Sequence, residues 1–243
     1  ASNAFVLFAG VQHVYVADEF GHIAAVALAV PVTLQGRPVC CLYWLTGQGS
    51  RSVAGRVDHL CAQQKLRGAG FVVVVPAGAE QAALLQDKGF QWAFPLRCLP
   101  REVERNLWSQ AEFDSVTARK LGELRARFWP DTVQLPPEQM AVVLGDLYSR
   151  GATLVSNNDG NGIYFRKEDT LYFVELMAEN DRAAEILMEA AREKEVIVEK
   201  AVITVGAAQN LFLGEGTRQD YGMIRFEGEP FDVSESYMRL MLD

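Results

Sequence analysis

The stretch from Arg37 to Phe90 constrains the fold more than any other part of the chain. It contains two apolar runs, Val39–Leu45 and Phe71–Val75, each followed by a segment of helical character. Phe71–Val75 is apolar at every position, as expected of a central strand that is covered on both faces. The order strand, helix, strand, helix predicts an α/β fold for this half of the chain.

The loop between the first run and its helix predicts an anion site. Thr46 to Arg56 combines glycines, serines and arginines at the point where the helix begins. Because the first N–H groups of a helix have no partner inside it, such a loop can hold a phosphate. The apolar residues Val53, Val57 and Leu60 recur close to a period of 3.6, which supports the helix.

Bulk composition excludes several protein classes. The 243 residues are 49% apolar and 22% charged, which predicts a packed core rather than disorder. The net charge of −8 argues against general nucleic-acid binding and is compatible with cationic substrates such as amines. No apolar run is as long as a membrane span, and no signal-peptide pattern is present near the start. We expect a cytoplasmic protein without membrane association.

The cysteines show no metal or disulfide pattern. Cys40, Cys41, Cys61 and Cys98 contain no CxxC pair. We expect no metal site and no disulfide, and interpret the thiols as buried core groups in a reducing compartment.

The second half repeats the order of elements in the first. Its predicted strands, helix and glycine-rich turn are Thr153–Ser156, Gly162–Arg166, Thr170–Ala178, Asp181–Lys194, Ala201–Val205, Gly214–Gly222 and Met223–Phe226. A degenerate tandem repeat of one fold explains this order. A polar linker, Pro100–Asn106, and two amphipathic helices, Val116–Phe128 and Pro137–Arg150, separate the halves. We predict domains at 1–99 and 152–243, with linker and helices at 100–151.

This order of elements resembles the GNAT family of acyl-CoA-dependent N-acyltransferases, from roughly Val14 to Leu96 and more faintly from Thr153 to Phe226. The resemblance implies two GNAT-like α/β domains, each with a mixed, mostly antiparallel central sheet flanked by helices. It also implies acetyl-CoA as co-substrate. The family's first strand and helix are not visible, and Ser2-Asn3-Ala4 looks like the remnant of an expression tag. We therefore expect N-terminal elements of the first domain to be missing.

The resemblance assigns a coenzyme site to the loop described above. In the family, a Q/R-x-x-G-x-G/A pattern holds the coenzyme pyrophosphate through backbone amides. Arg51 takes the first position here, Ala54 replaces the first glycine and Arg56 the last small residue. The residues assigned to the coenzyme are Leu45, Thr46, Arg51, Ser52, Val53, Ala54, Gly55 and Arg56. The other interpretation is a serine-capped surface helix with two solvated arginines.

A second motif, Pro76 to Phe90, resembles the family segment that ends in a tyrosine-containing helical turn and Gly-Phe. That tyrosine often protonates the departing coenzyme thiolate. Leu85 takes its place here and has no proton to give. A missing general acid typically costs roughly 10²–10⁴ in rate, so proximity of two bound substrates can still accelerate transfer.

The second half resembles the same fold without its coenzyme loop. Only Glu179-Asn180 separates its strand from its helix, and Glu179 would repel a phosphate. We interpret this half as a structural or substrate-shaping domain.

Two carboxylates are candidate catalytic bases. Strict strand alternation places Glu175 on one face with Leu171 and Phe173, where a carboxylate must be paired, protonated or functional. Arg166 is the expected partner if Glu175 is paired. Asp243 is the second candidate, because an apolar tail that precedes it is expected to dock on the protein.

We predict an N-acyltransferase that transfers acetyl from acetyl-CoA to a primary amine of a small molecule or peptide, with a homodimer left open. The alternative is a catalytically degenerate GNAT-fold protein that acts as a coenzyme-A-binding or protein-interaction module. Leu85 and Ala54 favour the alternative. A third class, a dimerisation module, would show an exposed apolar patch and no cleft.

Overall fold

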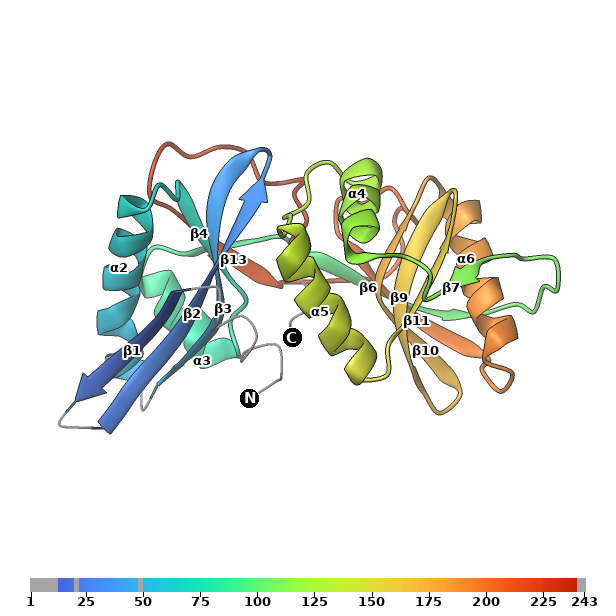
Figure 1. Cartoon of the computed structure of the whole chain (residues 1–243), viewed down its shortest axis with the longest axis horizontal. Helices are drawn as coiled ribbons and strands as arrows, with labels where there is room; N and C mark the ends of the chain where they lie inside the picture. Colours follow the sequence, from blue (N-terminus) through green and yellow to red (C-terminus); the bar gives the residue numbers. More distant parts are fainter. Residues whose placement is uncertain (1–12, 20–21, 48–49, 240–243) are drawn as a thin grey trace. The chain divides into compact units, whose positions relative to one another are not determined.

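The computed structural model describes the backbone of residues 13–19, 22–47 and 50–239, and the side chains of 26–42 and 56–239. Within these residues the chain forms two compact units. Unit 1 comprises 13–94 and 220–234, and unit 2 comprises 95–219 and 235–239. Each unit contains one sheet with helices packed on it (Figure 1). In this described part, no helix is both long and apolar enough to cross a membrane.

Unit 1 contains a six-stranded sheet in the order β1-β2-β3-β4-β13-β5. Its strands are β1 (His13–Glu19), β2 (His22–Leu34), β3 (Arg37–Gly47), β4 (Phe71–Val74), β5 (Gln91–Ala93) and β13 (Gly222–Phe226). β3 and β4 are parallel, and the other neighbours are antiparallel. Helices α2 (Ser50–Leu66) and α3 (Ala79–Asp87) follow β3 and β4 and share one apolar core with the sheet.

The end of α3 explains the Gly-Phe motif. Gly89 has φ of 80°, a left-handed conformation that favours glycine after a helix. The N–H of Phe90 then bonds back to the carbonyl of Leu85, and both side chains are buried in the core of unit 1.

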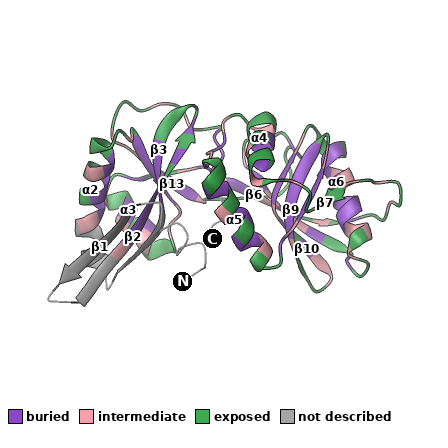
Figure 2. Ribbon diagram, viewed as in Figure 1, coloured by how far each residue is buried: buried purple, intermediate pink, exposed green. Residues whose placement is uncertain are grey.

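Unit 2 contains a seven-stranded sheet in the order β12-β6-β11-β10-β9-β8-β7. Its strands are β6 (Leu96–Glu102), β7 (Glu112–Phe113), β8 (Thr153–Asn157), β9 (Gly160–Lys167), β10 (Thr170–Ala178), β11 (Lys200–Gly206) and β12 (Thr217–Gln219). Only β10 and β11 pair in parallel. The helices are α4 (Ala118–Phe128), α5 (Pro137–Ser149) and α6 (Asp181–Lys194). Figure 2 shows that the central strands of both sheets are buried.

Capping residues mark the helix starts in unit 2. The side chain of Thr117 accepts a hydrogen bond from the N–H of Lys120 at the start of α4. Asn180 caps α6 in the same way through Ala183. Such caps satisfy N–H groups that have no partner inside the helix. The predicted helices over Val116–Phe128, Pro137–Arg150 and Asp181–Lys194 are confirmed within two residues at each end.

Each sheet contains one strand that lies far from its neighbours in the sequence. β13 is the last strand among the described residues, yet it lies between β4 and β5 of unit 1. β6 precedes the other strands of unit 2, yet it lies between β11 and β12. We call β6 and β13 the exchanged strands. The predicted division at 1–99, 100–151 and 152–243 follows chain order and stays a prediction, whereas the compact units do not follow chain order.

Two local expectations were wrong. Pro100–Glu102 was interpreted as linker because it is polar, but these residues complete β6 and pair with β11. The predicted turn at Gly214–Gly222 contains the short strand β12, which pairs with β6. Both errors have one cause: within the described residues, Pro100–Glu102 and β12 are each paired along one side only, and a segment with one free edge needs little apolar character when its partner lies far away in the sequence.

An arginine on each exchanged strand joins it to the unit that receives it. In unit 2, the buried guanidinium of Arg97 on β6 donates to the carbonyls of Gln209, Leu211, Phe212 and Glu215 at 2.7–2.9 Å. These bonds fix the loop between β11 and β12, where unit 1 has helix α3 between β4 and β5. In unit 1, Arg225 on β13 donates to Asp58 of α2 at 2.7 Å and to the carbonyl of Lys88 at 3.1 Å.

Candidate functional site

The sheet of unit 1 splits between its two parallel strands. β3 pairs with β4 from Cys40–Val72 to Leu42–Val74, where β4 ends. β3 continues to Gly47 and stays paired with β2 along its other edge. Among the described pairings, none involves the β4 side of β3 beyond Leu42. A strand edge of this kind presents N–H and C=O groups to whatever lies between the two strands.

The split leads directly to a helix N-terminus. β3 ends at Gly47, and α2 begins at Ser50. The first turn of α2 contains no acidic residue, so its unpaired N–H groups and the helix dipole favour an anion.

The predicted coenzyme residues lie at these two places. Leu45 and Thr46 are in β3, opposite Ala27 and Val26 of β2. The remaining predicted residues, Arg51, Ser52, Val53, Ala54, Gly55 and Arg56, form the first turns of α2. Their side chains lie outside the described residues up to Gly55, and Arg56 is half-buried. Their contact with a coenzyme stays a prediction.

Leu85, which the resemblance described above aligns with a tyrosine of the GNAT family, is fully buried in the core of unit 1. It packs in one cluster with Val57 and Cys61 of α2 and Val74 of β4. A side chain in this position therefore contributes to core packing, and it supplies no proton for a leaving thiolate.

The corresponding split in unit 2 contains side chains of the protein itself. β10 and β11 pair in parallel from Thr170–Lys200 to Phe173–Ile203. Beyond that point, Nε2 of Gln209 donates to the carbonyl of Leu176 on β10 at 2.8 Å. Its Oε1 accepts from the N–H of Gly206 on β11 at 3.1 Å. The amide of Gln209 thus connects the two strands where they separate.

Two aromatic rings pack against the same split. A methyl group added at Gly206 would come within 3.0 Å of the ring of Tyr237 and 3.3 Å of the indole of Trp129. The rings of Trp129 and Tyr237 are 5.8 Å apart. A side chain at this position of β11 would require the two rings to shift by a few tenths of an ångström.

Glu175 lies in β10 beside this filled split and is fully buried. It forms an ion pair with Arg125 of α4 and accepts a hydrogen bond from the hydroxyl of Tyr237 at 3.4 Å. Burial raises the pKa of Glu175, and Arg125 opposes that shift. The expected partner Arg166 was wrong, because Arg166 pairs with Glu195 at 3.3 Å.

A β-bulge explains why the neighbours of Glu175 differ from those expected. The register of β10 against β9 shifts between Phe173 and Glu175, so Phe173 lies opposite Tyr164 and Glu175 lies opposite Ile163. One extra residue reverses the faces of a strand. Leu171 and Phe173 therefore join the core beneath α6, whereas Glu175 lies on the opposite face and meets Arg125. A role of Glu175 as a base stays a prediction, and the geometry favours a structural pair.

The role of Arg125 was not predicted from the sequence, although a signal for it was present. Arg125 is completely buried, with 0% exposed surface. It lies on the same helical face as Leu121 and Leu124. An arginine at helical spacing within an apolar stripe indicates a buried carboxylate partner. It also donates to the carbonyl of Arg239 at 2.8 Å.

The C-terminal segment docks on unit 2, as its apolar character predicts. Tyr237 and Met238 are buried, and Tyr237 bonds through its backbone to Asp131 at 2.9 Å and Val133 at 2.8 Å. Asp243, the second candidate base, lies outside the described residues.

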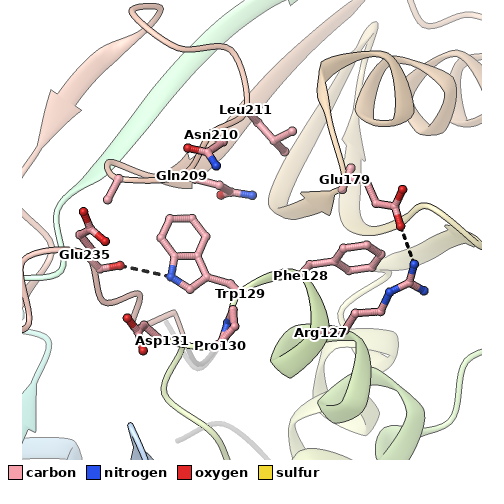
Figure 3. A pocket seen from close by; sticks show the side chains of 12 residues that line it. Arg127, Phe128, Trp129, Pro130, Asp131, Glu179, Gln209, Asn210, Leu211 and Glu235 are labelled. Atoms are coloured by element: carbon pink, nitrogen blue, oxygen red, sulfur yellow. Dashed lines mark hydrogen bonds and ion pairs between the residues drawn. The ribbon is translucent and has the colours of Figure 1, made fainter.

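Unit 2 contains a pocket of about 500 Å³ next to the filled split (Figure 3). It lies between the end of β10, the loop after β11 and the segment that follows α4. Its lining includes Trp129, Asp131, Glu179 and Glu235.

The cysteines are free, and three of them are core groups. Cys40, Cys41 and Cys61 are buried, and Cys98 is half-buried. Burial raises the pKa of Cys41 and of Cys61 to about 12, so neither thiol is a ready nucleophile. No cluster of three or more His, Cys, Asp and Glu residues that would suit a metal ion occurs in the described part of the chain.

Comparison with solved structures identifies the fold. A conserved protein of Enterococcus faecalis V583, described as a probable N-acyltransferase, superposes with a TM-score of 0.67 over 96% of this chain, at 12% identity. A GCN5-related N-acetyltransferase of Kribbella flavida gives a TM-score of 0.64 over 85% of this chain, at 14% identity. A tandem GNAT protein from the clavulanic acid biosynthesis pathway gives 0.52 over 91% of this chain and 84% of its own length, at 11% identity.

The sequence comparisons add no family assignment. No protein-family model and no curated protein matches the chain. The chain spans 65% of the Enterococcus protein and 58% of the Kribbella protein, less than two thirds of each. At identities this low the likeness concerns the fold alone. This chain is an α/β protein with two mixed, mostly antiparallel sheets, and its fold is GNAT-like.

Proposed function

We propose that the protein is an acyl-CoA-dependent N-acyltransferase that transfers acetyl from acetyl-CoA to a primary amine, with unit 1 as the coenzyme-binding domain. The observation that carries this proposal is the split between β3 and β4, which leads to the N-terminus of α2. On this proposal the chain is a tandem GNAT protein whose unit 2 is a degenerate copy.

The residues of unit 1 suit a coenzyme chemically. The edge of β3 around Leu45 and Thr46 offers backbone groups to an extended ligand, as in strand addition. The N-terminus of α2 favours a pyrophosphate, and Arg51 and Arg56 add cations that can pair with phosphate oxygens.

The acyl-coenzyme supplies the acyl group as a thioester. The protein would hold this group beside an amine, and backbone N–H groups would stabilise the negative charge that develops on the carbonyl oxygen. Leu85 cannot act as a general acid, because it is apolar and buried in the core. Transfer therefore rests on positioning more than on proton transfer.

The surroundings of the reaction belong to the same proposal. The net charge of −8 suits a cationic acceptor, either a small molecule or a peptide amine. We place the protein in the cytoplasm, without a nucleic-acid or membrane partner, and leave a homodimer open.

The second candidate function is a catalytically degenerate module that binds coenzyme A or a protein partner. Burial of Leu85 in the core favours it, since the family's general acid has no equivalent at that position. Pairing of Glu175 with Arg125 adds to this, because it removes one candidate base from contact with substrate.

Calorimetric titration with acetyl-CoA tests the proposal. We expect micromolar binding that weakens about tenfold in Arg51→Ala, since a charge-assisted hydrogen bond to phosphate is lost. Lys65→Ala is the matched control, because Lys65 is an exposed cation in the last turn of the same helix.

The outcomes separate the two candidates. Binding followed by release of free thiol in the presence of amines supports the acyltransferase. Binding without turnover over a broad panel of amines supports the degenerate coenzyme-binding module. Absence of binding rejects both coenzyme assignments.

A further inference from the structure

The pocket of unit 2 occupies the place in its sheet where the proposed coenzyme site lies in unit 1. The strand before α6 is β10, the first partner of the parallel pair, just as β3 precedes α2. The pocket is lined by Ala178 and Glu179 from the turn between β10 and α6. It therefore lies at the mouth of the second split.

The charge at this place is reversed between the units. Arg51 and Arg56 lie in the first turns of α2, whereas Glu179 and Asp181 flank the start of α6. Residues at the start of α6 also bond to the protein itself. Asn180 caps the helix through Ala183, and the carboxylate of Asp181 accepts from the N–H of Phe212 at 2.7 Å. An anion has no favourable position here.

The lining of the pocket carries excess negative charge. Its charged residues are three carboxylates and one guanidinium: Asp131, Glu179, Glu235 and Arg127. Arg127 pairs with Glu179 at 2.5 Å and donates to the carbonyl of Asn158 at 3.1 Å. The carboxylates of Asp131 and Glu235 have no ion-pair partner among the described residues.

An ordered indole lies between these two carboxylates and the rest of the pocket. Figure 3 shows Asp131 and Glu235 beside Trp129, with Phe128 further along the lining. Trp129 is held in place because its Nε1 donates to the carbonyl of Glu235 at 3.2 Å and its ring packs on Tyr237. An indole face attracts cations through its quadrupole, most strongly of all aromatic side chains.

We propose that this pocket binds a small organic cation that carries ammonium groups on a flexible, partly apolar chain. The ammonium groups pair with Asp131 and Glu235, and the chain lies against Trp129 and Phe128. A volume of about 500 Å³ accommodates a ligand of this size. The inference assigns a ligand to unit 2 and does not depend on acyl transfer in unit 1.

Calorimetry on the whole protein without coenzyme tests the proposal, with spermidine as the cation and triethylene glycol as an uncharged chain of similar length. We expect one spermidine site and no heat from triethylene glycol. The double variant Asp131→Asn/Glu235→Gln should weaken spermidine binding about tenfold or more, since two ion pairs are lost. Glu104→Gln, which changes an exposed carboxylate away from the pocket lining, should leave binding unchanged.

A gain of affinity provides the test that misfolding cannot imitate. Arg127→Ala removes the only cation of the lining and releases Glu179, so spermidine should bind about threefold more tightly. Equal weakening by Glu104→Gln, several equivalent sites, or unchanged binding in the double variant would overturn the proposal and indicate nonspecific attraction to an acidic protein. Absence of spermidine binding would overturn it outright. Acetyl-CoA binding is measured separately, so failure of either proposal leaves the other intact.

Discussion

The two sheets of this protein open in the same way and are filled differently. In unit 1, β3 continues past the end of β4 and leads to a helix whose first turns contain Arg51 and Arg56. In unit 2, the amide of Gln209 bridges the split, and the rings of Trp129 and Tyr237 pack beside it at Gly206. The helix that follows begins beside Glu179. One backbone path thus supports two opposite chemical environments.

If both proposed sites are correct, the fold specifies where a ligand binds, and the side chains specify which ligand. Parallel pairing that ends early creates a strand edge in both units. Arginines beside the edge suit a phosphate, whereas carboxylates and an indole suit a cation. An assignment of function by fold alone would treat the two units as equivalent.

The largest expected effect comes from removal of the buried ion pair that lies beside the split in unit 2. Glu175→Ala should lower the free energy of unfolding by about 3–5 kcal/mol, because it leaves the guanidinium of Arg125 buried without a counter-charge. Urea unfolding monitored by circular dichroism measures the change. Arg127→Ala is the control, because its pair with Glu179 is exposed and worth at most about 1 kcal/mol.

A small effect of Glu175→Ala would alter the comparison. If the variant unfolds within about 1 kcal/mol of the parent protein, Glu175 is not a structural group. It would then return to the list of candidate bases, which would contradict the proposal that unit 2 is degenerate.

The second prediction compares the arginines of the exchanged strands. Arg97→Ala should destabilise the protein by about 3 kcal/mol, because a buried cation loses hydrogen bonds to four carbonyls. Arg225→Ala should cost less, about 1–2 kcal/mol, because Arg225 itself is partly exposed and pairs with the half-exposed Asp58 as well as with Glu227. Urea unfolding of both variants measures the difference, with Arg97→Lys to separate charge from the forked geometry of arginine. Equal losses for Arg97→Ala and Arg225→Ala would show that the two strands are held alike.

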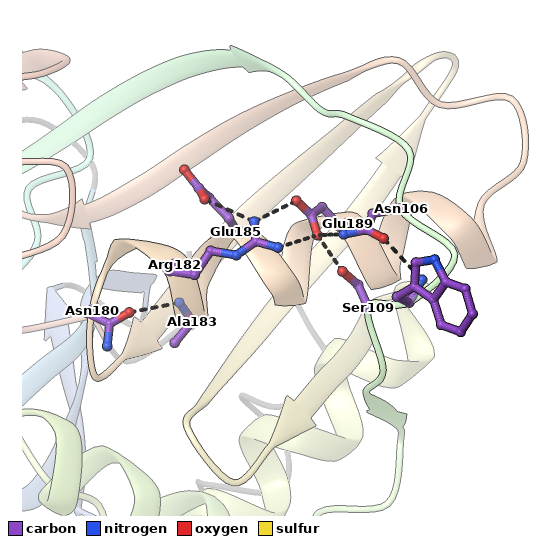
Figure 4. A network of polar contacts seen from close by, with 8 residues as sticks. Asn106, Ser109, Asn180, Arg182, Ala183, Glu185 and Glu189 are labelled. Atoms are coloured by element: carbon purple, nitrogen blue, oxygen red, sulfur yellow. Dashed lines mark hydrogen bonds and ion pairs between the residues drawn. The ribbon is translucent and has the colours of Figure 1, made fainter.

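The smallest expected effect concerns the stability of the folded protein at acidic pH. Asp58 of α2 and Glu189 of α6 each connect their helix to a distant segment, and Figure 4 shows Glu189 with Asn106 and Ser109. Hydrogen bonds from Lys88 and Arg225 lower the pKa of Asp58. Burial raises the pKa of Glu189, but hydrogen bonds from Ser109, Arg182 and Asn106 outweigh it and the net pKa is lowered.

A carboxyl with a lowered pKa stabilises the folded state above its ordinary pKa, and this contribution is lost as the pH falls through the lower folded value. Unfolding between pH 5 and pH 3 should therefore become easier, by about 1 kcal/mol at Glu189 and by less at the more exposed Asp58. Glu189→Gln should flatten this pH dependence more than Asp58→Asn. The reverse order would show that the network in unit 1 is the stronger one.

Elements with strong local patterns were predicted well. The apolar run Phe71–Val75 became β4 and the stripe that includes Val57 and Leu60 became the buried face of α2. Gly89-Phe90 closes α3 in the expected manner. These features depend on neighbours in the chain, so local sequence contains the information.

Features that depend on distant partners were not predicted. The exchanged strands β6 and β13 join sheets far from their sequence neighbours. The bulge before Glu175 and the pairing of that residue with Arg125 depend on the packing of α4 over β10. In the sequence, Gln209 is indistinguishable from an ordinary polar loop residue. Only the three-dimensional structure shows that its side chain bridges two strands.

The late position of β13 has a consequence for synthesis on the ribosome. β4 emerges well before its antiparallel partner on that side, which follows about 150 residues later. Until then, the sheet of nascent unit 1 is incomplete, and the backbone groups of β4 that pair with β13 have no strand partner. Unit 1 therefore cannot complete its sheet until β13 has been synthesised, and a product that ends before β13 would expose that edge to aggregation.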